Sequence, residues 1–166
     1  MSFICKRRSI RKYQEKEVEQ EKVLELLKAA MCAPSAWNQQ PWHFIVIRDR
    51  IKKQQIAEVH PYAKMVAQAP VCIIVCCDLS LVKSEKFWPQ DCSAATENIL
   101  IRATELGLGS VWCGVYPDEE RINGLKKLFS LPKNIIPFSV IAIGYPAEEP
   151  KPVEKFKPER IHYEGW

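Results

Sequence analysis

Residues 90–117, QDCSAATENILIRATELGLGSVWCGVYP, contain the helix and the strand around which we arrange the rest of the chain. Apolar side chains recur at helical spacing from about Gln90 to Leu106, and the glycines that follow end the predicted helix. Its run Ser93–Ala95 consists of small residues, which let another backbone approach closely, so we place this helix at the centre of the domain. A strand with a glycine in it is predicted to follow, from Val111 to Val115.

The other elements follow from hydrophobic spacing and from residues that favour helix starts and ends. Three further helices are predicted: Glu17–Cys32, Ile51–Val59 and a helix that begins after the N-cap Asp118 and runs to about Phe129. Three further strands are predicted: Trp42–Arg48, Val71–Asp78 and Pro137–Gly144. The strand Val71–Asp78 is apolar on both faces, which is typical of a central strand. Residues 79–90 are expected to form a surface connection.

The composition of the 166 residues is that of a globular protein, with 47% hydrophobic and 27% charged residues. These values exclude global disorder, and the length fits a single domain over residues 1–166. The net charge of +4 is too small to indicate a nucleic acid or another polyanion as partner. No apolar run reaches the ~18 residues of a membrane span, and the basic start lacks the apolar stretch of a secretory signal, so we expect a cytoplasmic protein.

The cysteines and histidines do not have the spacing of metal ligands. Seven cysteines form an odd set without C-x-x-C spacing: Cys5, Cys32, Cys72, Cys76, Cys77, Cys92 and Cys113. Three of them lie in the apolar run PVCIIVCCDL, where free thiols act as small core residues. In a reducing cytoplasm we expect neither a disulfide framework nor a metal site. The histidines are expected to be structural or exposed: His43, His60 and His162.

The final segment, Tyr145–Trp166, differs in composition from the rest of the chain. It holds four of the twelve prolines, which argue against a helix. It also carries four large apolar side chains: Phe156, Ile161, Tyr163 and Trp166. An extended arm with such side chains usually lies along another surface, and for a small domain a second copy of the chain supplies one. The alternative is a frayed tail, which the apolar side chains argue against.

Glycine-rich phosphate loops are absent from the sequence. Gly107-Leu108-Gly109 lacks the third glycine of the dinucleotide fingerprint, and it follows a helix rather than a strand. Gly109 and Gly114 have the spacing of a P-loop, but Val115-Tyr116 stands where lysine and serine or threonine are required. The sequence also lacks H-E-x-x-H and G-x-S-x-G. No metal site, nucleophile or general acid therefore stands out as catalytic.

A basic cluster at the start, Lys6-Arg7-Arg8-Ser9-Ile10-Arg11-Lys12, is the first candidate binding site. Arginine forks bind phosphate oxygens in pairs, and a serine hydroxyl adds a neutral donor. Three interpretations stay open for the cluster alone: a solvated run of charge, a patch for nucleic acid, and the site of one phosphorylated ligand. The rest of the chain lacks the basic surface that nucleic acid would need.

The second candidate is residues 33–44, APSAWNQQPWHF, between the first long helix and the first strand. Two prolines restrict its backbone, and the polar side chains between them can face a flat ligand. By itself this loop indicates nothing more.

Together, in this order, the two candidates resemble the nitroreductase family of FMN-dependent oxidoreductases. The pattern R-R-S-I-R-x-[YF] is followed, after the first long helix, by A-P-S-x-x-N-x-Q-P-W-x-F. Residues 90–117 resemble the family's central helix and flavin-edge strand, and AIGYPAEEPKP…KPERIHY resembles its last strand and C-terminal arm. The resemblance implies an α+β fold, a three-layer α-β-α sandwich with a mixed, mainly antiparallel sheet flanked by helices. It also implies a homodimer that exchanges C-terminal arms and binds two FMN molecules at its interface.

The resemblance further implies a two-step reaction. A reduced nicotinamide, NADH or NADPH, gives hydride to flavin N5 and leaves, and an electron-poor acceptor such as a nitroaromatic or quinone then takes the electrons. The protein binds, orients and tunes the cofactor, which agrees with the absence of other catalytic groups. Two alternatives stay open: another reaction on the same fold (flavin fragmentation, dehalogenation or dehydrogenation), and a flavoprotein that binds FMN without turnover. No nucleic-acid or membrane partner is expected.

The resemblance assigns several basic residues to the cofactor. Arg7, Arg8 and Ser9 match the family's phosphate-binding positions. Lys155, in the arm, matches a basic residue that returns to the phosphate. Arg11 matches the basic residue on the pyrimidine side of the isoalloxazine, where a positive charge stabilises the anionic reduced flavin.

The flavin ring is expected to meet residues of both chains. Cys113 and Gly114 match the strand whose backbone N–H groups approach flavin N5 and O4, and Lys64 matches a lysine near the ring. Many longer relatives carry Glu where this chain has Cys113, a change that leaves a backbone N–H intact. The loop that the partner subunit lays against the flavin is matched by Pro34, Ser35, Ala36 and Asn38. An acceptor is expected to stack on aromatic residues, for which the candidates are Trp37, Phe87, Trp88 and Trp112.

Overall fold

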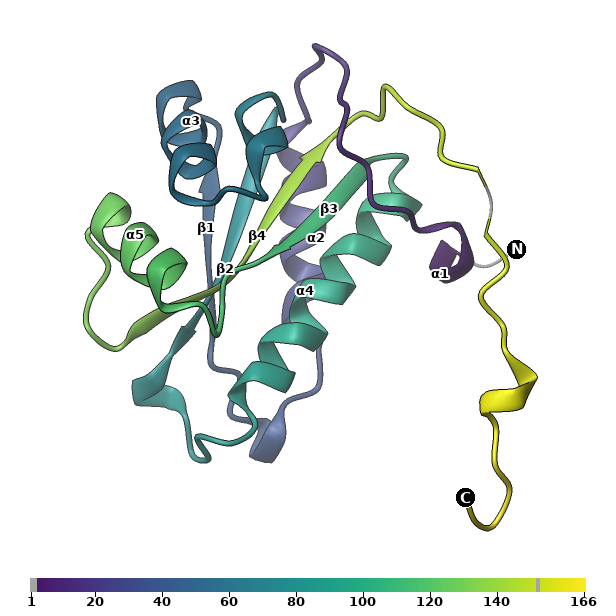
Figure 1. Ribbon diagram of the computed structural model, residues 1–166. Coiled ribbons are helices and arrows are strands. Elements are labelled where there is room, and N and C mark those ends of the chain that lie inside the picture. Colours follow the sequence, from purple (N-terminus) through teal and green to yellow (C-terminus); the bar gives the residue numbers. More distant parts are fainter. Residues whose placement is uncertain (1–2, 152) are drawn as a thin grey trace.

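The computed structural model describes residues 3–151 and 153–166, and it contains a four-stranded sheet with helices on both faces (Figure 1). The strands are β1 (Trp42–Ile47), β2 (Val71–Asp78), β3 (Gly109–Gly114) and β4 (Ile135–Gly144). They lie in the order β1-β2-β4-β3, and each neighbouring pair is antiparallel. An isolated parallel bridge joins Ser9 to Ser110. The predicted sheet is therefore antiparallel within its four strands, and the mixed part is confined to that bridge.

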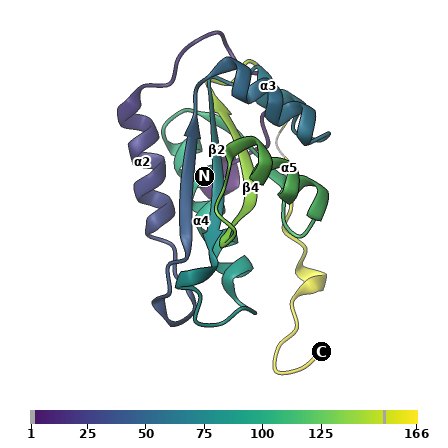
Figure 2. The ribbon, with the colours of Figure 1, turned by 90° about the vertical axis from the view of Figure 1, so that its left-hand side faces the viewer.

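The helices form two layers, one on each face of the sheet (Figure 2). Their bounds are α1 (Phe3–Lys6), α2 (Gln20–Met31), α3 (Arg50–Val59), α4 (Trp88–Glu105) and α5 (Glu119–Phe129). Helices α2 and α4 pack with Ile73 and Val75 of β2, whereas α3 and α5 pack with Cys72 and Ile74. Successive residues of a strand point to opposite faces, so β2 serves both cores. The α-β-α sandwich is confirmed. In the described residues, no helix is long and apolar enough to cross a membrane.

Two predicted features are confirmed residue by residue. Strand β2 has the predicted bounds and lies between β1 and β4, with every residue except Asp78 buried. Helix α5 begins after Asp118, whose carboxylate accepts a hydrogen bond from the N–H of Arg121 at 3.1 Å. Asp118 is thus the N-cap, as the sequence indicated.

Other element ends differ from the prediction because prolines are tolerated at particular positions. Helix α4 begins at Trp88 rather than Gln90, since Pro89 fits the first turn of a helix. The predicted surface connection is shorter for that reason. Strand β4 begins at Ile135, ahead of Pro137, where the β2–β4 pairing shifts register and accommodates a proline. Three further starts differ from the prediction: Gln20 for α2, Arg50 for α3 and Gly109 for β3.

The segment before α2 lies along the start of β3 and the end of β4. The N–H of Ile10 donates to the carbonyl oxygen of Ser110 at 3.0 Å, and the N–H of Gln14 donates to that of Tyr145 at 2.9 Å. A Cβ on Gly109 would lie 2.7 Å from the Ile10 side chain, so this crossing requires glycine. The crossing places the basic cluster beside β3.

The C-terminal arm leaves the body of the molecule after β4 (Figure 1). In its described residues it forms no α-helix, as expected, and contains one short turn, Pro158–Arg160. The four apolar side chains that were expected to be anchors are exposed: Phe156 by 68%, Ile161 by 43%, Tyr163 by 85% and Trp166 by 105%. Within one chain these side chains have no core to join.

Candidate functional site

The outer edge of β3 offers backbone groups to a ligand. Strand β4 covers one side of β3, and on the other side the N-terminal segment meets it at Ser110. Beyond that bridge, toward the C-terminal end of the strand, no other strand of the described residues pairs with β3. This open edge is part of the candidate site.

Cys113 and Gly114, the two residues predicted to present N–H groups to the flavin, direct these groups to opposite sides of β3. The N–H of Val115 donates to the carbonyl oxygen of Phe138 at 3.1 Å, on the β4 side. N–H groups alternate along a strand, so the N–H of Gly114 points to the open edge and that of Cys113 points to β4. A Cβ added to Gly114 would meet no atom within 4 Å, so the space beside it is free. Gly114 is therefore the donor that a flat ligand can reach.

Two side chains that the sequence analysis did not select hold Gly114. Its carbonyl oxygen lies 2.8 Å from Nε2 of His60 and accepts from Nη1 of Arg121 at 3.0 Å. His60 is fully buried, in agreement with the structural role expected for it. The sequence offered no signal for either contact, since His60 is 54 residues from Gly114 and Arg121, only 7 residues away, lies on another element.

The thiol of Cys113 belongs to the core rather than to the open edge. Its Sγ donates to the carbonyl oxygen of Tyr62 at 3.7 Å and lies 3.8 Å from Sδ of Met65. Burial raises the pKa of Cys113 to about 11, and the charge of Arg11 opposes that rise. The thiol is therefore protonated at neutral pH. Lys64, next to Met65, is exposed, so it lies in the same region as Cys113.

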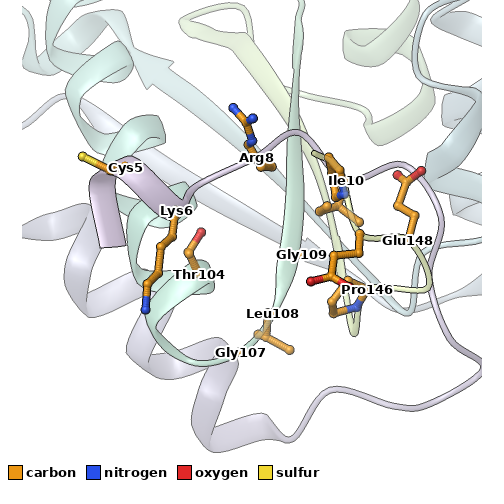
Figure 3. A pocket seen from close by; sticks show the side chains of 12 residues that line it. Cys5, Lys6, Arg8, Ile10, Thr104, Gly107, Leu108, Gly109, Pro146 and Glu148 are labelled. Carbon is orange, nitrogen blue, oxygen red and sulfur yellow. The ribbon is translucent and has the colours of Figure 1, made fainter. Parts of the chain in front are cut away.

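The basic cluster is divided between two sides of the N-terminal segment. Arg8 and Ile10 line a cavity of about 390 Å³, with Lys6, Thr104 and Glu148 among its other residues. Figure 3 shows these side chains coming from the N-terminal segment, the end of α4 and the segment after β4. Arg8 also donates to the carbonyl oxygen of Lys151 in the arm.

The remaining polar residues of the cluster do not line this cavity. Nε of Arg7 lies 3.5 Å from the Glu97 carboxylate of α4, and Ser9 forms its bridge with Ser110. The backbone N–H of Arg11 donates to the Glu148 carboxylate at 2.5 Å. The alternation of side chains along an extended segment accounts for this division.

The loop from Ser35 to Gln40 is strained. Three of its residues have positive φ angles without being glycine: Trp37 at 49°, Asn38 at 50° and Gln40 at 46°. Local hydrogen bonds hold this shape, since Ser35 Oγ accepts from the N–H of Gln40 at 3.0 Å and Asn38 Oδ1 accepts from Nε2 of Gln40 at 3.0 Å. Strain of this kind collects at ligand sites and persists only when the surroundings enforce it.

A buried carboxylate fixes the base of the loop. Asp91, in the first turn of α4, accepts from the N–H of Ala36 at 2.9 Å and from Nε2 of Gln39 at 2.5 Å. The Gln39 Oε1 atom accepts in turn from the N–H of Lys83 at 2.8 Å. Both Asp91 and Gln39 are buried. No local pattern in the sequence indicates this pair, because the residues that it joins are far apart along the chain.

Within one chain the loop and the cavity lie at different ends of α4. Asp91 holds the loop, and Thr104 lines the cavity with Arg8; between them the helix rises about 20 Å, at ~1.5 Å per residue. Among the described residues, no hydrogen bond or ion pair joins the loop to the basic cluster. Pro34 is exposed at the loop's entry, and Lys155 is exposed on the arm. One chain thus brings the charge of Arg11 near Cys113, the neighbour of Gly114, and places Lys64 next to Met65, which contacts Cys113, but it keeps the loop and Lys155 apart.

The candidate stacking aromatics have different environments. Trp88 is buried and meets Tyr116 edge-on, with ring centroids 4.5 Å apart. Trp112 is half-buried and lies 5.8 Å from Phe138. Trp37 and Phe87 are exposed and in mutual contact, with centroids 5.8 Å apart. Of the four candidates, only Trp37 and Phe87 are available to a ligand.

Metal chemistry has no support in the described residues, where no group of three or more His, Cys, Asp or Glu side chains is placed to hold an ion. The described cysteines are all free thiols, and five of the seven are buried: Cys72, Cys76, Cys77, Cys92 and Cys113.

Comparisons with known proteins identify the family and the fold. The model of the Nitroreductase family matches residues 4–63 and 52–145. A protein of Methanothermobacter thermautotrophicus, provisionally named NADH dehydrogenase/NAD(P)H nitroreductase, is 59% identical over 166 residues, which are 100% of this chain and 87% of that protein. A crystal structure from Clostridium acetobutylicum, provisionally named NADH oxidase, has a TM-score of 0.97 and 47% identity over 99% of this chain and 100% of that one. A provisionally named nitroreductase from Desulfovibrio desulfuricans, solved with FMN, has a TM-score of 0.86 and 34% identity over 99% and 95% of the two chains.

Proposed function

The chain belongs to the nitroreductase family, and on that premise we propose that it is an FMN-dependent oxidoreductase that takes hydride from NADH or NADPH. The observation that carries the proposal is the exposed end of β3, where the Gly114 N–H points to the open edge of the strand and the charge of Arg11 acts on the neighbouring Cys113. The relative solved with FMN supports the choice of cofactor.

The residues present fit FMN in both charge and shape. A flavin mononucleotide needs cationic and hydroxyl donors for its one terminal phosphate, and the N-terminal segment offers Arg8 on one side and Arg7 with Ser9 on the other. Its ring needs a backbone that it can approach closely, and Gly114 has no Cβ to obstruct it. When bound, FMN supplies the hydride-accepting N5 atom and passes electrons on to an acceptor.

The chain's own residues bind the cofactor and adjust the relative stability of its reduced form. Arg11 holds a positive charge near the ring end of the site, which favours the more negative, reduced form of the cofactor. The Glu148 carboxylate accepts from the backbone N–H groups of Arg11 and Lys12, so the backbone that carries this charge is fixed. The Gly114 N–H, which points to the open edge of β3, would donate to the edge of the bound ring. Cys113 remains protonated and holds the strand against its core.

We further propose that a second copy of the chain completes the site. The loop 35–40 is separated from the basic cluster in one chain, and the apolar side chains of the arm are exposed. Exposed apolar groups of this size are seldom left uncovered in a stable protein. In the proposed homodimer, the partner's loop 35–40 closes over the flavin, and the arms embrace the neighbouring chains and bring Lys155 to the phosphate.

The proposed acceptor is a flat, electron-poor molecule such as a nitroaromatic or a quinone. Trp37 and Phe87 are the exposed aromatic side chains near the strained loop, and planar acceptors stack on such rings. The transfer follows a ping-pong order, in which the oxidised nicotinamide leaves before the acceptor enters. The proposed place of action is the cytoplasm.

The experiment is an absorbance spectrum of the purified protein, followed by anaerobic addition of NADH or NADPH. We expect a flavin spectrum that belongs to FMN and that bleaches with the nicotinamide, and then recovers when a nitroaromatic or quinone is added. A protein that takes up no FMN on reconstitution would contradict the cofactor assignment. Bound FMN that neither nicotinamide reduces would point to a flavoprotein without this turnover, or to another reaction on the same fold.

A further inference from the structure

The carbonyl oxygen of Gly114 is held by two side chains that come from different helices. His60 is the residue that ends α3, and its Nε2 lies 2.8 Å from this oxygen. Arg121 lies in the first turn of α5, and its Nη1 donates to the same oxygen at 3.0 Å. Helix capping does not explain why donors from two separate helices bind the same carbonyl at the end of β3.

The hydrogen bonds of His60 define which ring nitrogen carries its proton. The N–H of Tyr62 donates to Nδ1 at 3.3 Å, so Nδ1 is the acceptor and Nε2 carries the proton toward Gly114. The ring is fully buried, and burial lowers the pKa of His60. A neutral His60 is therefore held between the Tyr62 backbone and the end of β3.

Arg121 is fixed at three points. Besides its bond to Gly114, its Nε lies 3.2 Å from Oδ2 of Asp118, and its guanidinium lies over the Tyr62 ring at 5.2 Å from the centroid. The Tyr62 ring and the Asp118 carboxylate restrain the guanidinium, which leaves its Nη1 directed at the strand.

The direction of the Gly114 carbonyl follows from peptide geometry. The N–H of Val115 donates to Phe138 in β4, and a planar trans peptide directs the preceding carbonyl the opposite way, to the open edge. Glycine has more backbone freedom than any other residue. Without the two donors, this carbonyl would face solvent, and only the pairing of β3 with β4 would restrain the two peptide planes that meet at Gly114.

We propose that His60 and Arg121 are positioning residues that fix the Gly114 backbone for the edge of the flavin ring, with Arg121 adding a positive charge there. The inference rests on the proposed function, since it names what holds the N–H that meets the flavin. Through this backbone, the two side chains affect how tightly the reduced and the oxidised cofactor are bound.

The test compares Arg121→Met with Lys126→Met. Both substitutions remove one positive charge from α5 and keep an unbranched side chain, but Lys126 donates to the carbonyl oxygen of Lys133 and not to Gly114. Arg121 is partly exposed, so its replacement leaves the core intact. In the ¹⁵N–¹H spectrum of the protein without added flavin, we expect Arg121→Met to move the Gly114 and Val115 signals and to speed amide exchange at Gly114. Lys126→Met should leave them in place.

The second readout is FMN binding in both redox states. We expect Arg121→Met to weaken the binding of reduced FMN by about tenfold more than the binding of oxidised FMN. A factor of this size corresponds to one charge-assisted hydrogen bond. For His60 the matched pair is His60→Gln, which retains a donor, and His60→Leu, which does not. His60→Gln should keep the wild-type ratio of the affinities for reduced and oxidised FMN. His60→Leu should lower the affinity for reduced FMN relative to that for oxidised FMN.

The outcomes separate this inference from the proposed function. If Arg121→Met and Lys126→Met give the same spectra and the same ratio of affinities, the inference is wrong while FMN binding by the wild type still stands. If the wild type binds no FMN, the proposed function fails, and the Gly114 signals alone decide whether His60 and Arg121 hold this backbone.

Discussion

The end of β3 and the loop 35–40 are the two halves of the proposed site, and they are built in opposite ways. Gly114 is held within one chain by His60 and Arg121, over a core that also takes the Cys113 thiol. The loop is strained and exposed at its tip, where hydrogen bonds within the loop hold its shape, and Asp91 ties down its base. The difference teaches that the end of β3 is held within a single chain, whereas the loop is the half that, in the proposed homodimer, closes over the site of a second chain.

The largest expected effect is on the assembly. Deleting residues 150–166 removes the arm with its exposed apolar side chains, so we expect both the dimer and the bound FMN to be lost, because the two are linked by mass action. Light scattering and flavin content, measured on the same sample, check this. The double substitution Phe156→Ser and Ile161→Ser keeps the chain length and should give an intermediate loss. A truncated chain that stays dimeric and yellow would contradict the proposed role of the arm.

The next effect concerns the basic cluster, which lies in the same chain as the end of β3 that it is proposed to serve. Arg8→Ala should weaken FMN binding by about 1.5–3 kcal/mol, the usual worth of a hydrogen bond to a charged group. Lys12→Ala is the control, since Lys12 is exposed in the same segment and no phosphate role is proposed for it. Titration of the flavin-free protein with FMN measures both. Equal affinities would leave Arg8 only its observed bond to the arm at Lys151.

A smaller effect is expected in the other half. Asp91→Asn places an amide donor against Nε2 of Gln39, which costs about 1–3 kcal/mol in the free energy of unfolding because a buried donor loses its acceptor. FMN affinity should fall as well, since the loop loses its base. Adding Gln39→Glu restores an acceptor opposite the amide introduced by Asp91→Asn, and denaturant unfolding of the single and double variants gives the coupling. A double variant that is no more stable than Asp91→Asn would refute the proposed role of the Asp91–Gln39 hydrogen bond in holding the loop.

The smallest effect is expected at Cys113. Its pKa is raised by burial to about 11 from a usual 9.0, so the folded protein keeps a proton there that the unfolded chain releases. The stability this supplies is complete below pH 9 and is lost as the pH rises through 11. Cys113→Ala should therefore leave FMN binding unchanged at neutral pH and make unfolding less pH-dependent between those values. Rapid alkylation of Cys113 by iodoacetamide at neutral pH would show a thiolate and contradict this account.

Much of the scaffold could be predicted from local sequence. The apolar run of β2 indicated a central strand, and Asp118 indicated the start of α5, because both signals depend on neighbouring residues alone. The starts of α4 and β4 were misplaced where Pro89 and Pro137 sit inside elements. Those prolines are tolerated for reasons of position and register, which a composition-based rule does not see.

The hydrogen bonds that hold the site in place could not be predicted from local sequence. His60 reaches Gly114, and Asp91 reaches Ala36, across separations that leave no periodic trace in the sequence. The direction of each N–H along β3 also depends on which neighbour pairs with it. The resemblance supplied candidate residues, and only the three-dimensional arrangement showed that one chain keeps the loop apart from the basic cluster.

The central claim, that each flavin site takes its loop from one chain and its basic cluster from the other, is tested most directly by mixing Arg8→Ala with Asp91→Asn subunits. Each variant alone is defective in both sites of its dimer. In a mixed dimer, one site combines both defects, and the other combines an intact basic cluster with an intact loop. After unfolding and refolding the two together, the account predicts that FMN content and NADH-dependent bleaching rise above those of either variant. A mixture that binds no more FMN than the average of its parts would contradict the shared site.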